Sequence, residues 1–146
     1  MNLSKFSERL SELIFEAGLN AHTFASKLGC GENTIYAYIQ RKRFPTLKML
    51  VLIADYFECS ADFLLGLEEE NYSRYYEKCP SFRERFPALL SQCGISQYRL
   101  EKETKISHST MVCWKNGKKE PTVESIVRIS AALDRTVDFV LGRSKS

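Results

Sequence analysis

The sequence predicts an all-α protein made of two tandem units that share one five-helix fold. Three observations support this prediction: an internal repeat with a fixed offset, apolar side chains at helical spacing, and glycine, proline and capping residues where helices should begin and end. No segment shows the strict alternation of apolar and polar residues that is typical of a half-buried strand.

An internal repeat aligns residues 6–66 with residues 82–142 without a gap, and 15 of the 61 aligned positions are identical. The identical positions include residues that fix the backbone at turns, namely Gly18 and Gly94, Pro45 and Pro121, and Gly66 and Gly142. Matching turns without an insertion imply the same fold twice. We therefore divide the chain into a first domain at 1–66, a linker at 67–81 and a second domain at 82–146.

Five helices are predicted in each repeat from apolar spacing and from the residues at the helix ends. In the first repeat, Asn20 and Ser60 are candidate N-caps, and Gly18, Gly29 and Gly66 are candidate helix stops. The predicted helices of the first repeat are roughly 10–17, 21–28, 32–41, 46–57 and 61–65. Those of the second repeat are 82–93, 97–104, 108–116, 122–133 and 137–141.

The linker at 67–81 contains no glycine and a single proline, Pro80, so its composition permits a helix that ends before that proline. Such a helix would place Tyr72, Tyr75 and Tyr76 on one face. Two interpretations of this stripe are open. It packs on one of the domains, or it forms the interface of a homodimer.

The composition indicates a folded globular protein, because hydrophobic residues make up 44% of the chain and charged residues 27%. No apolar run approaches the roughly 18 residues of a membrane span, and the N-terminus lacks the apolar core of a signal peptide. We therefore expect a cytoplasmic protein without a membrane partner. The five cysteines and two histidines show no metal-ligand spacing, so we expect reduced cysteines, no metal site and no cofactor.

In both repeats, two short helices are followed by a tight turn, a third helix, a basic loop and a proline. The segments that carry this pattern are Gly18–Asn20, Phe24–Ala25, Leu28–Gly31, Asn33–Ile35 and Lys42–Pro45, and then Gly94–Gln97, Leu100, Ile106–Ser107, Ser109–Met111, Trp114, Asn116–Lys119 and Pro121. The pattern resembles the phage-repressor-like helix-turn-helix family, which comprises lambda repressor and Cro relatives and is also called the Xre family. The resemblance covers nearly the whole chain, twice. It implies a sequence-specific transcriptional regulator of double-stranded DNA, of the repressor type found in phages and mobile elements.

The resemblance places the third helix of each repeat, residues 32–41 and 108–116, in the major groove of DNA. That groove is about 12 Å wide and admits one helix, whose N-terminal residues reach the edges of the bases. The residues expected to contact bases are Glu32, Asn33, Tyr36, His108, Ser109 and Cys113. The alternative is that these are ordinary exposed residues of a helix.

Phosphate contacts are expected from the basic segment that follows each third helix, because family members place this segment along the DNA backbone. The expected residues are Arg41, Lys42, Arg43, Lys115, Asn116, Lys118 and Lys119. Gln97 begins a second helix and matches a family position that contacts the DNA backbone. A basic run can also be a solvated face, but here it recurs at the same place in both repeats.

Each repeat departs from the family pattern. The family favours a small residue where the second helix crosses the third, and the first repeat has Ala25 there, whereas the second has Glu101. Lys105 replaces the turn glycine Gly29, so the lysine either adopts a positive φ, at a cost of about 1 kcal/mol, or the turn changes. The first repeat departs at two further positions, with Ala21 instead of Gln97 and Arg41 instead of Gly117.

Charge distinguishes the two repeats. Residues 6–66 contain six basic and seven acidic residues, for a net charge of −1, whereas residues 82–142 contain ten and seven, for a net charge of +3. The second repeat is therefore the better DNA binder by electrostatics, and the first is the better-formed motif by packing. An alternative function follows from this difference: one repeat no longer contacts DNA and serves as a protein-interaction or dimerisation module.

An enzyme is the third class of function, and the sequence argues against it. His108 and Cys113 lie about 140° apart around one helix, so they do not face each other as a catalytic pair would. The sequence contains no glycine-rich phosphate loop and no plausible pair of catalytic carboxylates.

Overall fold

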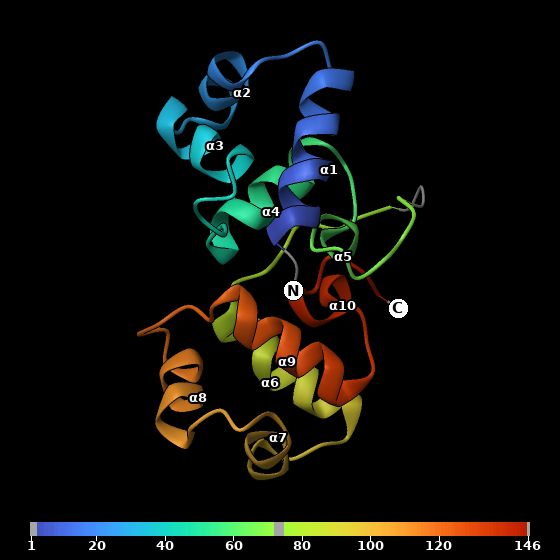
Figure 1. The fold of residues 1–146 in the computed structure, drawn as a ribbon. Coiled ribbons are helices and arrows are strands. Elements are labelled where there is room, and N and C mark those ends of the chain that lie inside the picture. The colour runs from blue at the N-terminus through green and yellow to red at the C-terminus, as the bar shows by residue number, and fades with distance from the viewer. Residues whose placement is uncertain (1–2, 72–74, 146) are drawn as a thin grey trace. The chain divides into compact units, whose positions relative to one another are not determined.

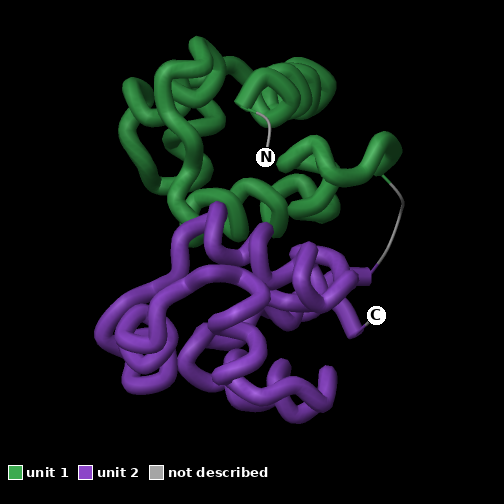
Figure 2. Tube along the Cα trace, turned by 60° about the horizontal axis from the view of Figure 1, so that its bottom comes forward, with its two compact units in different colours: residues 1–74 green, residues 75–146 purple. Residues whose placement is uncertain are grey.

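A computed structural model describes residues 3–71 and 75–145, and within these residues it contains ten helices and no strand (Figure 1). The chain divides into two compact units, residues 1–74 and 75–146 (Figure 2). Each unit contains five helices in the order that the sequence predicts, so the all-α, two-unit fold is confirmed. None of the helices in the described part of the chain is both long and apolar enough to cross a membrane.

Unit 1 is built around a core that all of its helices share. Its helices are α1 (Leu3–Glu16), α2 (Ala21–Leu28), α3 (Glu32–Ile39), α4 (Leu47–Tyr56) and α5 (Ala61–Leu64). Helix α1 packs on α3 and α5, and α2 packs on α3 and α4. The fully buried side chains of this core include Phe6, Leu10, Phe24, Ile35, Leu50 and Ile53. These residues stand at the apolar positions of the helical pattern in the sequence, so burial of that stripe holds the unit together.

Unit 2 repeats this arrangement with α6 (Phe82–Cys93), α7 (Gln97–Thr104), α8 (His108–Lys115), α9 (Val123–Leu133) and α10 (Val137–Leu141). Its core contains an aromatic cluster in which the ring of Trp114 meets those of Phe82 and Phe86 edge-on, at centroid distances of 5.6 and 5.5 Å. A serine or threonine caps each of its helices by accepting a hydrogen bond from the backbone N–H three residues later.

Five pairs of residues separated by 76 positions have the same left-handed backbone conformation. They are Gly18 and Gly94, Gly29 and Lys105, Arg41 and Gly117, Glu58 and Asp134, and Gly66 and Gly142. The turns are therefore the same in both units even where the residue differs. Lys105 has a φ of 60°, so the first of the two alternatives for this lysine is correct: the turn is kept, at a cost of about 1 kcal/mol relative to glycine.

The third helix of unit 1 is shorter than the sequence predicts. The prediction extends it to residue 41, but α3 ends at Ile39. Gln40 is the C-cap, and Arg41 has a φ of 61°, which is incompatible with a continuing right-handed helix. The N–H of Arg41 instead donates to the carbonyl of Tyr38, so the basic segment begins as a loop.

The prediction of a helical linker is wrong for the described residues of the segment 67–81, none of which is helical. The physical reason lies in hydrogen bonds to the end of unit 2. The N–H of Glu77 donates to the carbonyl of Arg143 at 2.8 Å, and the thiol of Cys79 donates to the carbonyl of Leu141 at 3.3 Å. These contacts hold Glu77 and Cys79 along the C-terminal residues of unit 2. At the other end of the segment, the N–H groups of Leu67 and Glu68 donate to the carbonyl of Asp62 in unit 1.

The predicted tyrosine stripe does not form at the two tyrosines that the structure describes. Tyr75 is 85% exposed. Tyr76 is only partly exposed, and the guanidinium carbon of Arg143 lies 4.6 Å from its ring centroid. Tyr72 lies outside the described residues. Without a helix, neighbouring tyrosines face different surroundings.

A buried arginine in the first helix of each unit holds the last helix in place. Arg9 donates to the carbonyl oxygens of Phe63 and Glu68, and Arg85, at the equivalent position, donates to those of Phe139 and Val140. The bonds to Phe63, Phe139 and Val140 satisfy carbonyl groups in the last turn of a helix, which have no partner inside the helix, and the bond to Glu68 holds the loop that follows α5.

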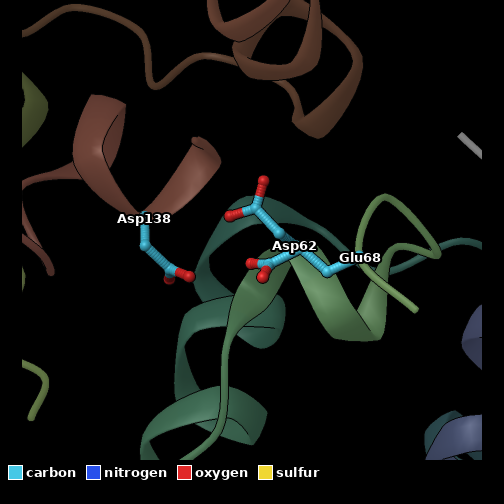
Figure 3. Close-up of side chains that lie close together, drawn as sticks. All are labelled: Asp62, Glu68 and Asp138. Atoms are coloured by element: carbon cyan, nitrogen blue, oxygen red, sulfur yellow. The ribbon is translucent and has the colours of Figure 1, made fainter. Parts of the chain in front are cut away.

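Acidic side chains also stabilise the last helix of each unit. In unit 1, Glu68 accepts a hydrogen bond at 3.0 Å from Ser60, the residue that caps α5. Figure 3 shows Glu68 together with Asp62 of α5. In unit 2, Asp138, also labelled in Figure 3, lies in α10 and forms a buried ion pair with Arg143. Both arrangements fasten the residues that follow the last helix.

Candidate nucleic-acid interface

The turn between the second and third helices presents the N-terminus of the third helix to solvent. In unit 2, Lys105 ends α7, Ile106 is buried, and the hydroxyl of Ser107 caps α8 by accepting from the N–H of Thr110 at 3.2 Å. In unit 1, Gly31 occupies the cap position of α3 and has no side chain to cap it. The two third helices therefore start from the same turn but with different capping.

The N-terminal half of α3 exposes the residues that the sequence predicts as base contacts. Glu32, Asn33 and Tyr36 are all exposed, and Ile35 and Tyr38, on the opposite side of the helix, are buried. A shallow surface hollow of about 410 Å³ lies along the exposed side and is lined by Asn33, Tyr36, Ala37, Gln40 and Lys42. The outward face of α3 can thus meet a ligand without rearranging the core.

Helix α8 exposes His108 and Ser109 in the same way, and the hydroxyl of Ser109 lies 3.3 Å from that of Ser107. Cys113 is only partly exposed, and Trp114 is buried. Of the three base contacts predicted in unit 2, the structure therefore places two at the exposed N-terminus of the helix and the third further along it.

The basic loops fold back on the third helix identically in the two units. In unit 1, the N–H groups of Lys42 and Arg43 both donate to the carbonyl of Ala37, at 2.9 and 3.3 Å. In unit 2, the N–H groups of Lys118 and Lys119 donate to the carbonyl of Cys113, at 3.0 and 3.3 Å. These bonds keep the basic residues next to the third helix in each unit.

All of the residues predicted to contact phosphate from these loops are exposed, namely Arg41, Lys42, Arg43, Lys115, Asn116, Lys118 and Lys119. The side-chain oxygen of Asn116 accepts the N–H of Lys118 at 3.0 Å, which braces the loop and leaves the amide hydrogens of Asn116 for a ligand. Gln97, at the start of α7, is partly exposed and contacts α8 directly.

A polar cluster joins the two helices of the motif in unit 2. The carboxylate oxygen Oε2 of Glu101 lies 2.8 Å from Nε2 of Gln97 and 2.8 Å from Nδ1 of His108. The hydrogen bond from Gln97, followed by that from His108, lowers the pKa of the Glu101 carboxyl below its ordinary value. In the sequence, Glu101 stands out only as a departure from the small residue that the resemblance implies at this position. The spacing of Gln97 and Glu101, four residues apart on one helix, could have indicated the first contact.

Unit 1 has a different contact at the equivalent corner. Ala21 and Ala25 occupy the positions of Gln97 and Glu101, and both are buried. His22 of α2 lies 3.3 Å from Glu32 of α3, between Nδ1 and Oε2, and both side chains are well exposed. No periodic pattern in the sequence points to His22, because His22 and Glu32 lie on either side of the turn.

Taken together, the exposed third helix, its tight preceding turn and the basic loop beside it define a DNA-binding helix-turn-helix protein. The comparison with protein families matches the helix-turn-helix family twice, over residues 12–64 and 88–140. The chain belongs to this family, that of the phage-repressor-like or Xre-type DNA-binding regulators, and carries two copies of its domain in tandem. The comparisons with curated proteins and with solved structures find no match.

Proposed function

We propose that this protein is a sequence-specific transcriptional repressor that inserts α3 and α8 into successive major grooves of double-stranded DNA. The observation that carries the proposal is the repeated surface of each unit. In both, an exposed helix N-terminus with polar side chains lies beside a basic loop that is hydrogen-bonded back onto the same helix. Side chains at the N-terminus of such a helix suit base edges, and the loop suits phosphates.

The two units contribute differently under this proposal. Unit 2 supplies most of the electrostatic attraction, because its repeat carries a net charge of +3 and that of unit 1 carries −1. Unit 1 supplies Asn33, whose amide can bond an adenine bidentately in the major groove. Affinity then rests mainly on one unit, and sequence discrimination rests on both.

Linker length is compatible with one chain covering two half-sites. Glu77 and Cys79 are held on unit 2, so the ten residues from 67 to 76 set the reach; they span at most about 36 Å if extended, and adjacent half-sites on one face of DNA lie about 34 Å apart. We therefore propose that the operator has two parts, one for each unit.

Selection from a pool of random duplexes with the full-length protein tests the proposal. We expect one enriched motif with two conserved segments. We also expect binding to fall steeply with salt, with a log–log slope of roughly −4 to −7 for four to eight phosphate contacts. A slope near zero, or selection without enrichment, would contradict DNA recognition.

A second candidate function for unit 1 is a docking or dimerisation module. The observation that favours it is the exposed carboxylate of Glu32 at the N-terminus of α3, which repels phosphate and can accept only from the amino groups of cytosine and adenine among the base edges of the major groove. Alanine at Asn33 and at Lys42 and Arg43, in the full chain, distinguishes the functions. Docking predicts unchanged DNA affinity and sequence preference for these variants.

Dimerisation through the linker tyrosines is a separate proposal. Of the linker tyrosines that the structure describes, the proposal rests on Tyr75, which is 85% exposed. Sedimentation of the Tyr75→Ser variant tests it. A wild-type dimer that the substitution converts to a monomer supports the proposal, and an unchanged sedimentation coefficient contradicts it.

A further inference from the structure

One carboxylate in unit 2 connects the two helices of the helix-turn-helix motif at their polar corner. Glu101 of α7 contacts Gln97 on its own helix and His108, the first residue of α8, through the same oxygen atom. The side chain of Glu101 is only 14% exposed, whereas that of His108 is 73% exposed. Glu101 therefore lies behind His108 and can influence it without touching DNA.

The chemistry of the carboxylate fixes the direction of both hydrogen bonds. Because its pKa is lowered by the two neighbours, Glu101 is ionised at neutral pH and can only accept hydrogen bonds. Gln97 must then donate one of its amide N–H groups, and His108 must donate from Nδ1. Nε2 of Gln97 also lies 3.5 Å from Nδ1 of His108, but an Nδ1 that carries a hydrogen cannot accept, so the second N–H of Gln97 is left for a phosphate oxygen, in line with the role that the sequence predicts for it.

A neutral imidazole with its hydrogen on Nδ1 has none on Nε2, so the exposed nitrogen of His108 is a hydrogen-bond acceptor. In the major groove, only the amino groups of adenine and cytosine donate, whereas guanine and thymine present acceptors. We infer that Glu101 is a positioning residue that fixes the tautomer of His108 and thereby makes unit 2 prefer adenine or cytosine at the base that His108 faces. This inference rests on the proposed function.

Unit 1 lacks this arrangement of a carboxylate and a histidine and so provides a comparison within the same chain. Unit 1 has Ala25 at the position of Glu101, and the exposed residue that begins its third helix is Glu32 instead of a histidine. Its histidine, His22, lies on α2 beside Glu32, so no imidazole stands at the start of α3. The proposed preference for the amino group of adenine or cytosine, read by the imidazole of His108, is therefore a property of unit 2.

A first experiment measures base preference with the full-length protein at about pH 8, where a free imidazole is neutral. The probe is the duplex that the wild-type protein enriches from a random pool, together with all single-base variants of it. The variants compared are Glu101→Gln, His108→Ala and the double variant. The matched control is Glu103→Gln, which removes the same charge from α7 at a carboxylate that pairs with Arg99 and not with α8.

The wild-type protein should favour adenine or cytosine at one position by roughly five- to tenfold, the value of one hydrogen bond. Glu101→Gln should abolish this preference, because an amide both accepts and donates and so permits either tautomer of His108. His108→Ala should abolish it equally, and the double variant should show no further loss. Glu103→Gln should keep it.

The outcomes separate the two proposals. Absence of any DNA binding by the wild-type protein overturns the proposed function. DNA binding in which Glu101→Gln keeps the preference, or weakens every sequence alike, overturns the role of Glu101 alone.

A second experiment needs no DNA and stands even if the proposed function fails. Long-range ¹H–¹⁵N spectra of the free protein report which imidazole nitrogen carries the hydrogen. The chain has only two histidines, so a His22→Asn variant assigns the signals. We expect the Nδ1–H tautomer at His108 in the wild-type protein and in Glu103→Gln, and a mixture in Glu101→Gln. A wild-type His108 with its hydrogen on Nε2 would overturn the inference.

Discussion

The corner where the second helix meets the third has the same backbone conformation in both units but different side chains, which are small and apolar in unit 1 and polar in unit 2. In unit 1, buried Ala21 and Ala25 let the helices approach, and the polar contact there is the exposed pair of His22 and Glu32. In unit 2, the corresponding positions carry the cluster centred on Glu101, and its third helix has a serine cap. Capping and packing thus keep the fold constant while the recognition surface varies.

Under the proposed function, this difference gives the two units different roles in DNA binding. In unit 1, the negative charge of Glu32 at the start of α3 weakens attraction to DNA phosphates, so this unit suits discrimination between bases more than affinity. In unit 2, ordered polar groups lie beside a strongly basic loop, so this unit suits both affinity for DNA and discrimination between bases.

The largest effect is expected in the aromatic core. Trp114→Ala should destabilise unit 2 by about 3–5 kcal/mol, because the indole is buried against Phe82 and Phe86 and its removal leaves a cavity. Urea unfolding followed by circular dichroism measures the loss. Tyr98→Ala, at a side chain that is 64% exposed, is the control and should change stability by less than about 0.5 kcal/mol. Similar losses for both variants would contradict the assignment of the core.

The next effect compares the basic loops. Lys118→Ala with Lys119→Ala should weaken binding to all DNA sequences alike and reduce the salt slope by about two, one for each phosphate contact removed. The same change at the equivalent residues Lys42 and Arg43 should have a smaller effect, because unit 1 has the lower net charge. Arg128→Ala, an exposed residue of α9 that pairs with Glu124, is the control. A larger loss from unit 1 would reverse the order of the units.

A third prediction compares Asn33 and Ser109, which occupy equivalent positions in α3 and α8. Asn33→Ala should reduce discrimination for adenine by about 1–3 kcal/mol, because an amide can form two hydrogen bonds to that base. Ser109→Ala should cost about 1 kcal/mol, the value of one neutral hydrogen bond. Competition binding with single-base variants of the selected duplex measures both. If neither substitution changes base preference, neither helix enters the groove at these residues.

Much of the fold could be predicted from the sequence because its determinants are local. Caps such as Asn20 and Ser107, and stops such as Gly18 and Gly94, mark helix ends within a few residues of where they act. The linker could not be predicted in this way. Its helix-permitting composition was outweighed by hydrogen bonds from Glu77 and Cys79 to residues more than 60 positions later in the chain, which no local pattern encodes.

The candidate site could be predicted only in part: its exposed residues could be predicted from the sequence, but the contacts between its side chains could not. The exposed residues and the basic loops followed from helical spacing and from the repeat. The contacts between Glu101 and His108, and between His22 and Glu32, cross a turn and join residues 7 and 10 positions apart. Helical periodicity relates residues on one helix and does not reach across a change of direction. These contacts therefore emerge only from the folded chain.

The smallest effect tests the turn between the second and third helices, where unit 1 has a glycine and unit 2 has a lysine. Lys105 and Gly29 have φ values of 60° and 75°, and a Cβ on Gly29 would meet no atom within 4 Å, so conformational strain alone decides its effect. Lys105→Gly should stabilise unit 2 by about 0.5–1 kcal/mol, because the relief of strain exceeds the entropy that glycine adds to the unfolded chain. Gly29→Ala should destabilise unit 1 by about 1 kcal/mol. Lys105→Ala keeps the Cβ and removes the charge, so it should give no gain. Urea unfolding of the three variants measures these changes, and a gain from Lys105→Ala equal to that from Lys105→Gly would assign the effect to charge and not to the backbone.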